Sequence, residues 1–526
     1  MDTKTVLAKA FIALILFSAL IGVQFVKVAE ANFIPPPNHA SGIFIRSDGS
    51  VDPSTAPIQR VGDVYTFTGD VSVGIAVQRS DAIIDGKGYQ LTGDSGGTGV
   101  YLQSVNNVTV QNVNIQGFIR GFYLDHTNRS TVKRNSVTGS GIVVTQQSYS
   151  NQIVENNVTG GGISLNFGSD NIVLNNDVSG ISIVFSTNIT VGNNRIANEE
   201  RVDVVLLYTD AGGGIYIDNS GDCNIFGNTI ERKTCGINIW HCTNLNFSNN
   251  TLEDNQVGFK LWGCDLQHNL HSIDTTNTVN GKPVYFLVNK SNFQVPTNAG
   301  WIAAVNCANI TVESWASTPN WDAILFIDTR DSKILNSKLT SNFNAIRFDS
   351  VSNCIISGNL IENNGYAAFY FEGAVDCTIT ENNVIDNFCY FNIWHDSANN
   401  KFFHNNFIGN WTGSPGDRDS HNFWDNGLEG NYWKEYTSTD ANGDGIGDAP
   451  YLIDGHSDSV DRHPLMNPAE ISEPEISDLV QEFSLWTPML LVLAVFTVAV
   501  TIYKQRLIKL RNKKRIICKQ ELLEKK

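Results

Sequence analysis

The segment Ile153-Val-Glu-Asn156-Asn157-Val158 shows a pattern that returns along most of the chain and from which the architecture can be inferred. Each copy has apolar residues, then asparagines, then a further apolar residue. Late copies begin at Ile355, Ile379 and Phe402. They lie about 23 residues apart, and a fixed period of this length indicates a solenoid of stacked repeats. Function is then expected on the long accessible face of the stack or at its ends.

The repeats carry strand patterning. Gly141-Ile-Val-Val-Thr145 and Gly214-Ile-Tyr-Ile-Asp218 alternate apolar with polar residues, and glycine bounds each run. No helical stripe and no Leu-x-x-Leu-x-Leu skeleton is present in the repeats. The pattern predicts an all-β parallel β-helix of about a dozen coils, with asparagines at the turns that pair from coil to coil.

Two further segments indicate how the chain is targeted. Lys4 and Lys9 precede an apolar run that ends at Ala29-Glu-Ala31, which is typical of a secretion signal. An uncharged run at 486–503, followed by a cluster of basic residues, predicts a membrane span with its tail in the cytoplasm. We therefore expect a single-pass type I protein of the cell membrane with extracellular repeats.

The expected organisation is a signal peptide (1–31), an N-terminal cap and first coil (32–95), β-helix repeats (96–430) with inserts near 198–214 and 275–301, a C-terminal cap (431–467), an acidic linker (468–484), a transmembrane helix (485–503) and a basic cytoplasmic tail (504–526).

The formal net charge is −17 although the C-terminal tail is strongly basic, so the external part is acidic. This argues against nucleic acid as a partner. Cys242 and Cys264 lie one coil apart, as do Cys354 and Cys377. Such pairs are either buried thiols or disulfides between coils.

The strongest local motif is a calcium-type loop. Oxygen ligands recur with the spacing of such loops, and a glycine permits the sharp turn. The metal ligands expected are Asp440, Asn442, Asp444, the backbone carbonyl of Ile446, and Asp448. Tyr451 stands where a bidentate Glu is usual, so Asp454, Asp458 or Asp461 would have to supply the last ligand. We expect structural calcium here; the alternative is an acidic turn without metal.

A second constellation depends on repeat register. Aligning the repeats places four acids at one coil position: Asp328, Asp349, Glu372 and Asp396. Stacked like charges raise each other's pKa or recruit a cation, and paired carboxylates are also the groups of a retaining glycosidase. The four acids have three interpretations: solvated strand ends, a binding site or, as a weak candidate, a catalytic site.

Exposed aromatic side chains on a solenoid face are candidate sugar platforms. The candidates are Trp240, Trp262, Tyr370 and Trp394. The alternative is that these rings pack beneath loops.

Together these features resemble the NosD-like right-handed parallel β-helix family, which has a pectin-lyase-like fold and archaeal cell-surface members. The residues that carry the resemblance are Ile83-Ile-Asp-Gly-Lys-Gly-Tyr89, the Asn-Asn repeats, Val279-Asn-Gly-Lys-Pro-Val-Tyr285 and the segment from Asn431-Tyr-Trp433 to Asp461-Arg-His-Pro-Leu465. The family name implies copper handling, which the sequence does not favour because soft methionine ligands are scarce.

The leading expectation is a surface module that binds glycans or cell-envelope polymers. One alternative is a polysaccharide lyase or glycoside hydrolase that acts through the stacked carboxylates. The other is a purely structural envelope protein.

Overall fold

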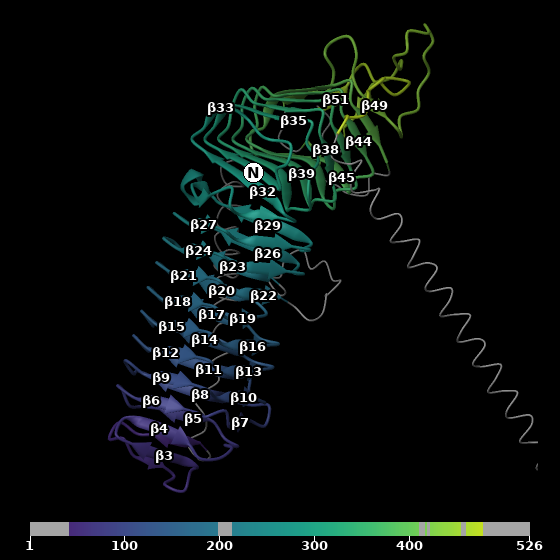
Figure 1. Cartoon of the computed structure of the whole chain (residues 1–526). Coiled ribbons are helices and arrows are strands. Elements are labelled where there is room, and N and C mark those ends of the chain that lie inside the picture. The colour runs from purple at the N-terminus through teal and green to yellow at the C-terminus, as the bar shows by residue number, and fades with distance from the viewer. Residues whose placement is uncertain (1–41, 198–212, 410–415, 418–420, 454–458, 477–526) are drawn as a thin grey trace, which may run out of the picture. The chain divides into compact units, whose positions relative to one another are not determined.

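The structure, a computed structural model, describes residues 42–197, 213–409, 416–417, 421–453 and 459–476. Every described strand belongs to the first of two units, Met1–Glu473 and Pro474–Lys526. This first unit is an all-β parallel solenoid of about 16 coils (Figure 1). Within the described ranges no helix has the length and apolar character needed to cross a bilayer. The predicted signal peptide (1–31) and transmembrane helix (485–503) lie outside them.

The N-terminal coils form a first stack with three sheets. Sheet A1 contains β1 (Ile43–Ile45), β5 (Ile75–Val77), β8 (Thr98–Gln103), β11 (Arg120–Asp125), β14 (Gly141–Thr145), β17 (Ile163–Asn166), β20 (Ile181–Val184), β23 (Gly213–Asp218), β26 (Cys235–Trp240) and β29 (Val257–Trp262), with β2 (Val51–Asp52) antiparallel at its edge. Sheet B1 contains β3 (Ile58–Val61), β4 (Val64–Phe67), β6 (Ile83–Asp85), β9 (Thr109–Gln111), β12 (Thr131–Lys133), β15 (Gln152–Val154), β18 (Ile172–Leu174), β21 (Thr190–Gly192), β24 (Asn224–Phe226), β27 (Asn246–Ser248) and β30 (Ser272–Ile273). Sheet C1 contains β7 (Gln90–Thr92), β10 (Asn114–Gln116), β13 (Ser136–Thr138), β16 (Asn157–Thr159), β19 (Asp177–Val178), β22 (Arg195–Ala197), β25 (Thr229–Glu231), β28 (Thr251–Glu253) and β31 (Thr278–Val279).

The C-terminal coils form a second stack with the same three-sheet arrangement. Sheet A2 contains β32 (Lys282–Val288), β34 (Trp301–Val305), β36 (Asp322–Ile327), β39 (Asn344–Asp349), β42 (Ala367–Glu372) and β45 (Cys389–Trp394). Sheet B2 contains β33 (Ser291–Gln294), β35 (Ala308–Glu313), β37 (Lys333–Leu335), β40 (Ile355–Ser357), β43 (Thr378–Thr380), β46 (Ala398–Phe403) and β48 (His421–Phe423). Sheet C2 contains β38 (Lys338–Thr340), β41 (Leu360–Glu362), β44 (Asn383–Ile385), β47 (Asn406–Ile408) and β49 (Tyr432–Trp433); a small separate sheet pairs β50 (Tyr451–Leu452) with β51 (Val460–Asp461). A short 3-10 helix, η1 (Leu266–Asn269), follows β29.

The solenoid has about 16 coils, more than the dozen expected. The reason lies in the N-terminal coils, which lack the asparagine phrase. The backbone N–H of Val113 bonds to the side chain of Asn135, the first asparagine in its column, and Val113 itself holds the same place one coil earlier. Counting asparagine phrases therefore misses complete coils.

The two stacks meet at the insert expected near 275–301. Its predicted hairpin is present, because β31 pairs antiparallel with β32. An insertion in a solenoid is expected to project as a loop, and this one does not. It joins sheets C1 and A2 into one 15-stranded sheet, and β32 begins the second stack. The other expected insert, near 198–214, lies almost wholly outside the described residues.

Each stack has its own apolar core of β-branched and aromatic side chains. The two cores meet at sheet A2. Ala303, Val305, Leu325 and Ile327 pack with the core of the first stack, whereas Ala304 and Phe326, on the opposite face of the same strands, belong to the core of the second. Strand side chains alternate between faces. The outer face of A2 therefore closes the end of the first core.

Asparagine ladders hold successive coils together, as predicted. Asn156 shows the pattern: its backbone N–H and its Nδ2 both donate to Oδ1 of Asn176 in the next coil, at 2.9 and 3.0 Å. Its own Oδ1 accepts the equivalent two bonds from Asn135. An amide side chain suits this place because it donates and accepts at once. The direction is fixed, so the last rung of a ladder presents donors that need an acceptor.

A buried carboxylate ends one ladder. Asp461 Oδ2 accepts from the backbone N–H of Asn431 at 2.8 Å and from Trp433 Nε1 at 2.9 Å, and its Oδ1 accepts from the backbone N–H of His463 at 3.1 Å. An ionised carboxylate only accepts, which matches a ladder end that only donates. Burial raises the pKa of Asp461 to about 6. Asp461 is thus a core group, and its oxygens serve this ladder end.

Candidate functional site at the junction of the two stacks

The last strand of sheet A1, β29, has no further A1 strand beside it. An open edge of this kind leaves backbone groups unpaired. The second stack supplies their partners: Pro319 accepts from the N–H of Gly258 at 3.1 Å, and the N–H of Trp321 donates to the carbonyl of Phe259 at 3.1 Å. Segments distant in the sequence thus close the edge together, and this is the junction of the two stacks.

Arg347 on β39 completes this closure. Its Nη1 donates to the carbonyl of Leu261 at 3.1 Å, and its guanidinium carbon lies 4.0 Å from the ring centre of Trp262. The side chain is 1% exposed, and its charge is balanced by Asp322 at 3.8 Å and Asp349 at 3.7 Å. A buried charge needs such partners. Arg347 therefore joins a backbone edge, an aromatic ring and two carboxylates.

Two further charged groups lie below the surface at the junction. Burial raises the pKa of Asp322, while the charge of Arg347 opposes the shift. Asp322 also accepts from Asn344 Nδ2 at 2.8 Å. Lys260 Nζ lies 4.0 Å from the ring centre of Trp321 and 4.7 Å from that of Trp240. Both cations at the junction are therefore covered, by aromatic rings in particular.

The outer rim of the site is a line of strand-final residues, here called the junction line. On sheet A1, Asp218, Trp240 and Trp262 end β23, β26 and β29 and are register partners. On sheet A2, Asp349, Glu372 and Trp394 end β39, β42 and β45 and are register partners. Parallel stacking places the same strand position of successive coils side by side, about 4.8 Å apart. The fold thus gathers acids and indoles from both stacks along one rim.

Three of the four predicted aromatic residues contact one another. The rings of Trp240 and Trp262 stack at 6.0 Å, and Trp262 meets Tyr370 edge-on at 6.4 Å. The fourth, Trp394, is the register partner of Glu372 and stacks on His395 at 6.0 Å. Trp262 has Trp240 on one side and Arg347 on the other, so it serves as packing between the stacks. Trp240 also has Lys260 Nζ 4.7 Å from its ring centre, but its register partner on the side away from Trp262 is Asp218, so Trp240 is the better candidate for contact with a ligand.

The predicted column of four acids is only partly correct. Asp349 and Glu372 are register partners, as expected. Asp349 pairs with Ile327, so Asp328 lies one residue beyond the shared position; Glu372 pairs with Trp394, so Asp396 lies two residues beyond it. Strand-final residues and the left-handed turn residues that follow them look alike in the sequence, so aligned repeats place both kinds at one position. Asp328 and Asp396 are such turn residues, with φ of 46° and 60°.

The acids at the rim differ in environment. Burial raises the pKa of Asp349, and the adjacent Arg347 opposes that shift. Burial and the neighbouring charge of Asp349 also raise the pKa of Asp328. Glu372 lies 3.9 Å from His395 Nε2, with its side chain one-third exposed. The arrangement can accept hydrogen bonds from ligand hydroxyls, and a carboxyl with a raised pKa can also donate one.

The calcium-type loop is built around hydrogen bonds of its own acidic side chains. Asp440 Oδ1 accepts from the N–H of Gly443 at 2.7 Å, and its Oδ2 accepts from the N–H of Gly445 at 2.9 Å. Asp444 Oδ1 accepts from the N–H of Ile446 at 2.9 Å. Asp448 Oδ2 accepts from Thr439 Oγ1 at 2.7 Å. The loop is ordered by its own side chains.

Of the residues proposed for the last ligand, Asp461 is committed to the ladder end. Asp454 and Asp458 lie outside the described residues.

Repeat, parallel sheets and three-sheet coils define the molecule as a right-handed β-helix protein, and residues 162–299 match the right handed beta helix region. The particular family follows from a longer match. Residues 62–211 and 268–438, more than half of the chain, match the periplasmic copper-binding protein (NosD) family. The chain belongs to that family. Among curated proteins none matches.

Solved structures match the chain at low similarity. The Dettilon tailspike protein is 14% identical over 64% of this chain and 62% of its own, with a TM-score of 0.24. A lacto-N-biosidase from Eubacterium ramulus is 11% identical over 69% and 61%, with a TM-score of 0.23. A periplasmic alginate epimerase is 10% identical over 70% and 79%, with a TM-score of 0.18. The chain spans about six-tenths of the tailspike, and similarity at this level assigns no ligand.

The family description names copper, and the described residues do not fit it. None of their His, Cys, Asp and Glu side chains, those of the calcium-type loop included, forms a group of three or more placed to hold a metal ion. Soft sulfur ligands suit copper(I). The eight described cysteines are free thiols. Burial raises the pKa of Cys242 to about 12 and that of Cys223 to about 11, so these thiols stay protonated.

Proposed function

We propose that this NosD-family protein is an extracellular, membrane-anchored module that binds glycans at the junction line. The observation that carries the proposal is the indole of Trp240 in register with the carboxylate of Asp218. Rings stack on the apolar face of a sugar, and carboxylates accept bonds from its hydroxyls. Trp240 Nε1 donates to Asn238 Oδ1 at 2.7 Å, which fixes the ring's orientation. Few groups need to move on binding, which favours affinity.

The proposal is tested with a glycan array and the full-length chain. Trp240→Ala should lower glycan affinity at least tenfold without lowering the melting temperature by more than about 1 °C, which corresponds to roughly 1 kcal/mol in a domain of this size. Tyr89→Ala is the matched control, because this ring is 38% exposed and belongs to a turn before β7. Equal affinity of both variants and the parent chain would refute the site.

A second candidate is catalysis on polysaccharide by the register pair Asp349 and Glu372. The observation that favours it is the raised pKa of Asp349 beside a second carboxyl group, since glycoside hydrolases keep one acid protonated next to an ionised one. Asp349→Asn should then abolish release of reducing ends while binding persists. If the parent chain binds glycans and forms no product, catalysis is refuted and only the binding function stands.

The membrane anchor and structural calcium belong to the same proposal. The support for the anchor is the uncharged run at 486–503 with basic residues after it. The support for calcium is the ligand spacing from Asp440 to Asp448. Alkaline extraction of membranes tests the anchor: the full chain should stay with the membrane, and a chain ending at 484 should be released.

A further inference from the structure

Two phenylalanines occupy a place on the first stack where polar residues are usual. Each A1 strand from β8 to β26 is followed directly by a left-handed turn residue, and these residues form what is here called the A1 ridge. Its members are Ser104, His126, Gln146, Phe167, Phe185, Asn219 and His241, with φ between 45° and 55°. Polar residues, asparagine above all, tolerate this conformation, whereas a bulky residue pays for it in strain. The turn does not require phenylalanine.

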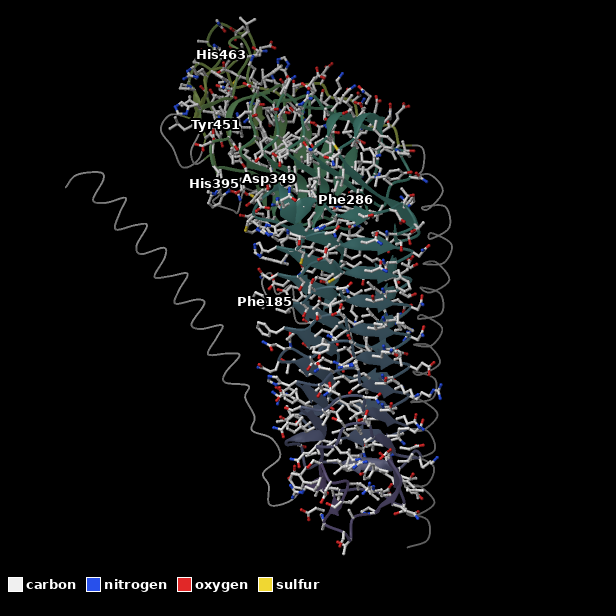
Figure 2. All side chains as sticks on the ribbon, turned by 90° about the vertical axis from the view of Figure 1, so that its left-hand side faces the viewer. Phe185, Phe286, Asp349, His395, Tyr451 and His463 are labelled. Atoms are coloured by element: carbon white, nitrogen blue, oxygen red, sulfur yellow. The ribbon has the colours of Figure 1, made fainter. Side chains whose placement is uncertain are left out.

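Both rings are accessible. Phe167 is 54% exposed and Phe185 is 52% exposed. They stack on each other at 5.2 Å with 10° between the ring planes. Figure 2 labels Phe185 at the rim of the stack, on the same side as Asp349 and His395. Side chains in such a place add nothing to a core, so their presence calls for another partner.

The A1 ridge runs along the axis of the first stack toward the junction of the two stacks. Phe167 follows β17, and Trp240 ends β26, three coils further on. At about 4.8 Å per coil the two ends lie roughly 14 Å apart. Between them the ridge and the junction line carry the hydrogen-bonding groups of Asp218 and Asn219, and His241 follows Trp240 directly. The order along the axis is aromatic, polar, aromatic, which suits a chain molecule laid parallel to the axis.

The charges define the chemistry of that chain. The cations of the junction are covered: Arg347 is 1% exposed and Lys260 is 9% exposed. The accessible charges of the rim are the carboxylates Asp218, Asp349 and Glu372, whose side chains are 21 to 33% exposed. A polyanion would be repelled. Two phenyl rings flanked by polar side chains also fall far short of the area a stable protein interface buries. With a polyanion and a protein partner excluded, the ligand class that fits is an extended neutral glycan.

We propose that Phe167 and Phe185 form a distal subsite for a linear neutral glycan of at least four sugars, whose other end lies on Trp240. This rests on the function proposed above, and it adds the length, direction and charge class of the ligand. The stepwise rise of the coils is comparable to the length of one extended pyranose unit, so successive sugars meet successive coils.

The test is calorimetric titration of the full-length chain with β-1,4-linked glucose and N-acetylglucosamine oligomers of two to six sugars. Affinity for at least one neutral series should rise with length up to four or five sugars. Phe185→Asn copies the ridge residue of the next coil, Asn219. It should lower affinity for the hexamer about three- to tenfold, as the loss of one aromatic stacking contact does, and leave affinity for the dimer unchanged. Phe167→Asn should behave alike.

The outcomes separate the two proposals. If Trp240→Ala abolishes binding and Phe185→Asn leaves the hexamer affinity unchanged, the subsite is refuted and the binding function stands. If neither the neutral oligomers nor oligogalacturonate bind, both fail. A lower melting temperature in Phe185→Asn would show that the ring is structural and refute the subsite, because asparagine is the better residue at positive φ. Tighter binding of oligogalacturonate than of neutral oligomers would refute the charge class.

Discussion

Arg347 covers one face of Trp262 at 4.0 Å and bonds to the carbonyl of Leu261 beside it. Through this contact Arg347 of the second stack closes part of the open edge of β29, the last strand of sheet A1. The junction line exists because of this arrangement: without it, Trp262 and Tyr370 would belong to separate surfaces. Binding and stability are therefore linked at this point, and variants must be chosen to separate them.

Arg347→Ala should destabilise the protein by about 3–5 kcal/mol, because it leaves Asp322 buried without its countercharge. Urea titration followed by circular dichroism measures the effect. The control is Arg134→Ala, which removes an exposed ion pair with Glu155 and should cost about 1 kcal/mol or less. Similar losses in both variants would show that Arg347 does not hold the stacks together.

The adjacent asparagines of one repeat should behave differently. Asn156→Ala removes the acceptor of two bonds from Asn135 and the donor of a bond to Asn176, and should cost roughly 3 kcal/mol or more, since each stranded buried group costs about 1–3 kcal/mol. Asn157→Ala, at an exposed position of β16, should stay within about 0.5 kcal/mol. Chemical denaturation measures the free energy of unfolding of both variants, and an equal loss in the two would contradict the role of the asparagine ladder.

The cap of the ladder should make stability depend on pH. The pKa of Asp461 is raised from 3.8 to about 6 in the folded chain. Between these values the folded state binds the proton more tightly than the unfolded state. The contribution of this group is therefore fully present below about pH 4 and is lost as the pH rises through 6. It amounts to about 3 kcal/mol at about 1.4 kcal/mol per pKa unit.

Comparison with Asp461→Asn isolates this group. The difference in unfolding free energy, parent minus variant, should fall between pH 4 and pH 7. A difference that does not change over this range, or that rises, would contradict the raised pKa.

Calcium should raise the melting temperature if the loop from Asp440 to Asp448 holds the ion. Chelation should reverse the increase, and Asp444→Asn should abolish most of it, because one oxygen ligand of the cation is lost. Asp265→Asn, an exposed acid at η1, is the control and should keep the full response. Differential scanning calorimetry with and without calcium is the measurement. An unchanged melt in the parent chain would remove calcium from the proposal.

Register explains which parts of the site could be predicted. The pairing of Asp349 with Glu372 followed from aligned repeats, and that of Trp240 with Trp262 follows the same rule. Asp328 was misplaced because a strand end and the turn residue after it look alike in one sequence. The sequence around Arg347 and Lys260 does not indicate that these two cations are buried, since their partners Asp322 and Trp321 come from other coils.

A repeat length and an alternation of apolar residues are local properties that every coil restates, so they are enough to predict a parallel β-helix held by asparagine ladders. The division into two stacks that meet at Arg347 could not be predicted in this way. An open strand edge and an open core must be closed by whichever distant segment reaches them, and packing makes that choice between residues 86 positions apart, Leu261 and Arg347.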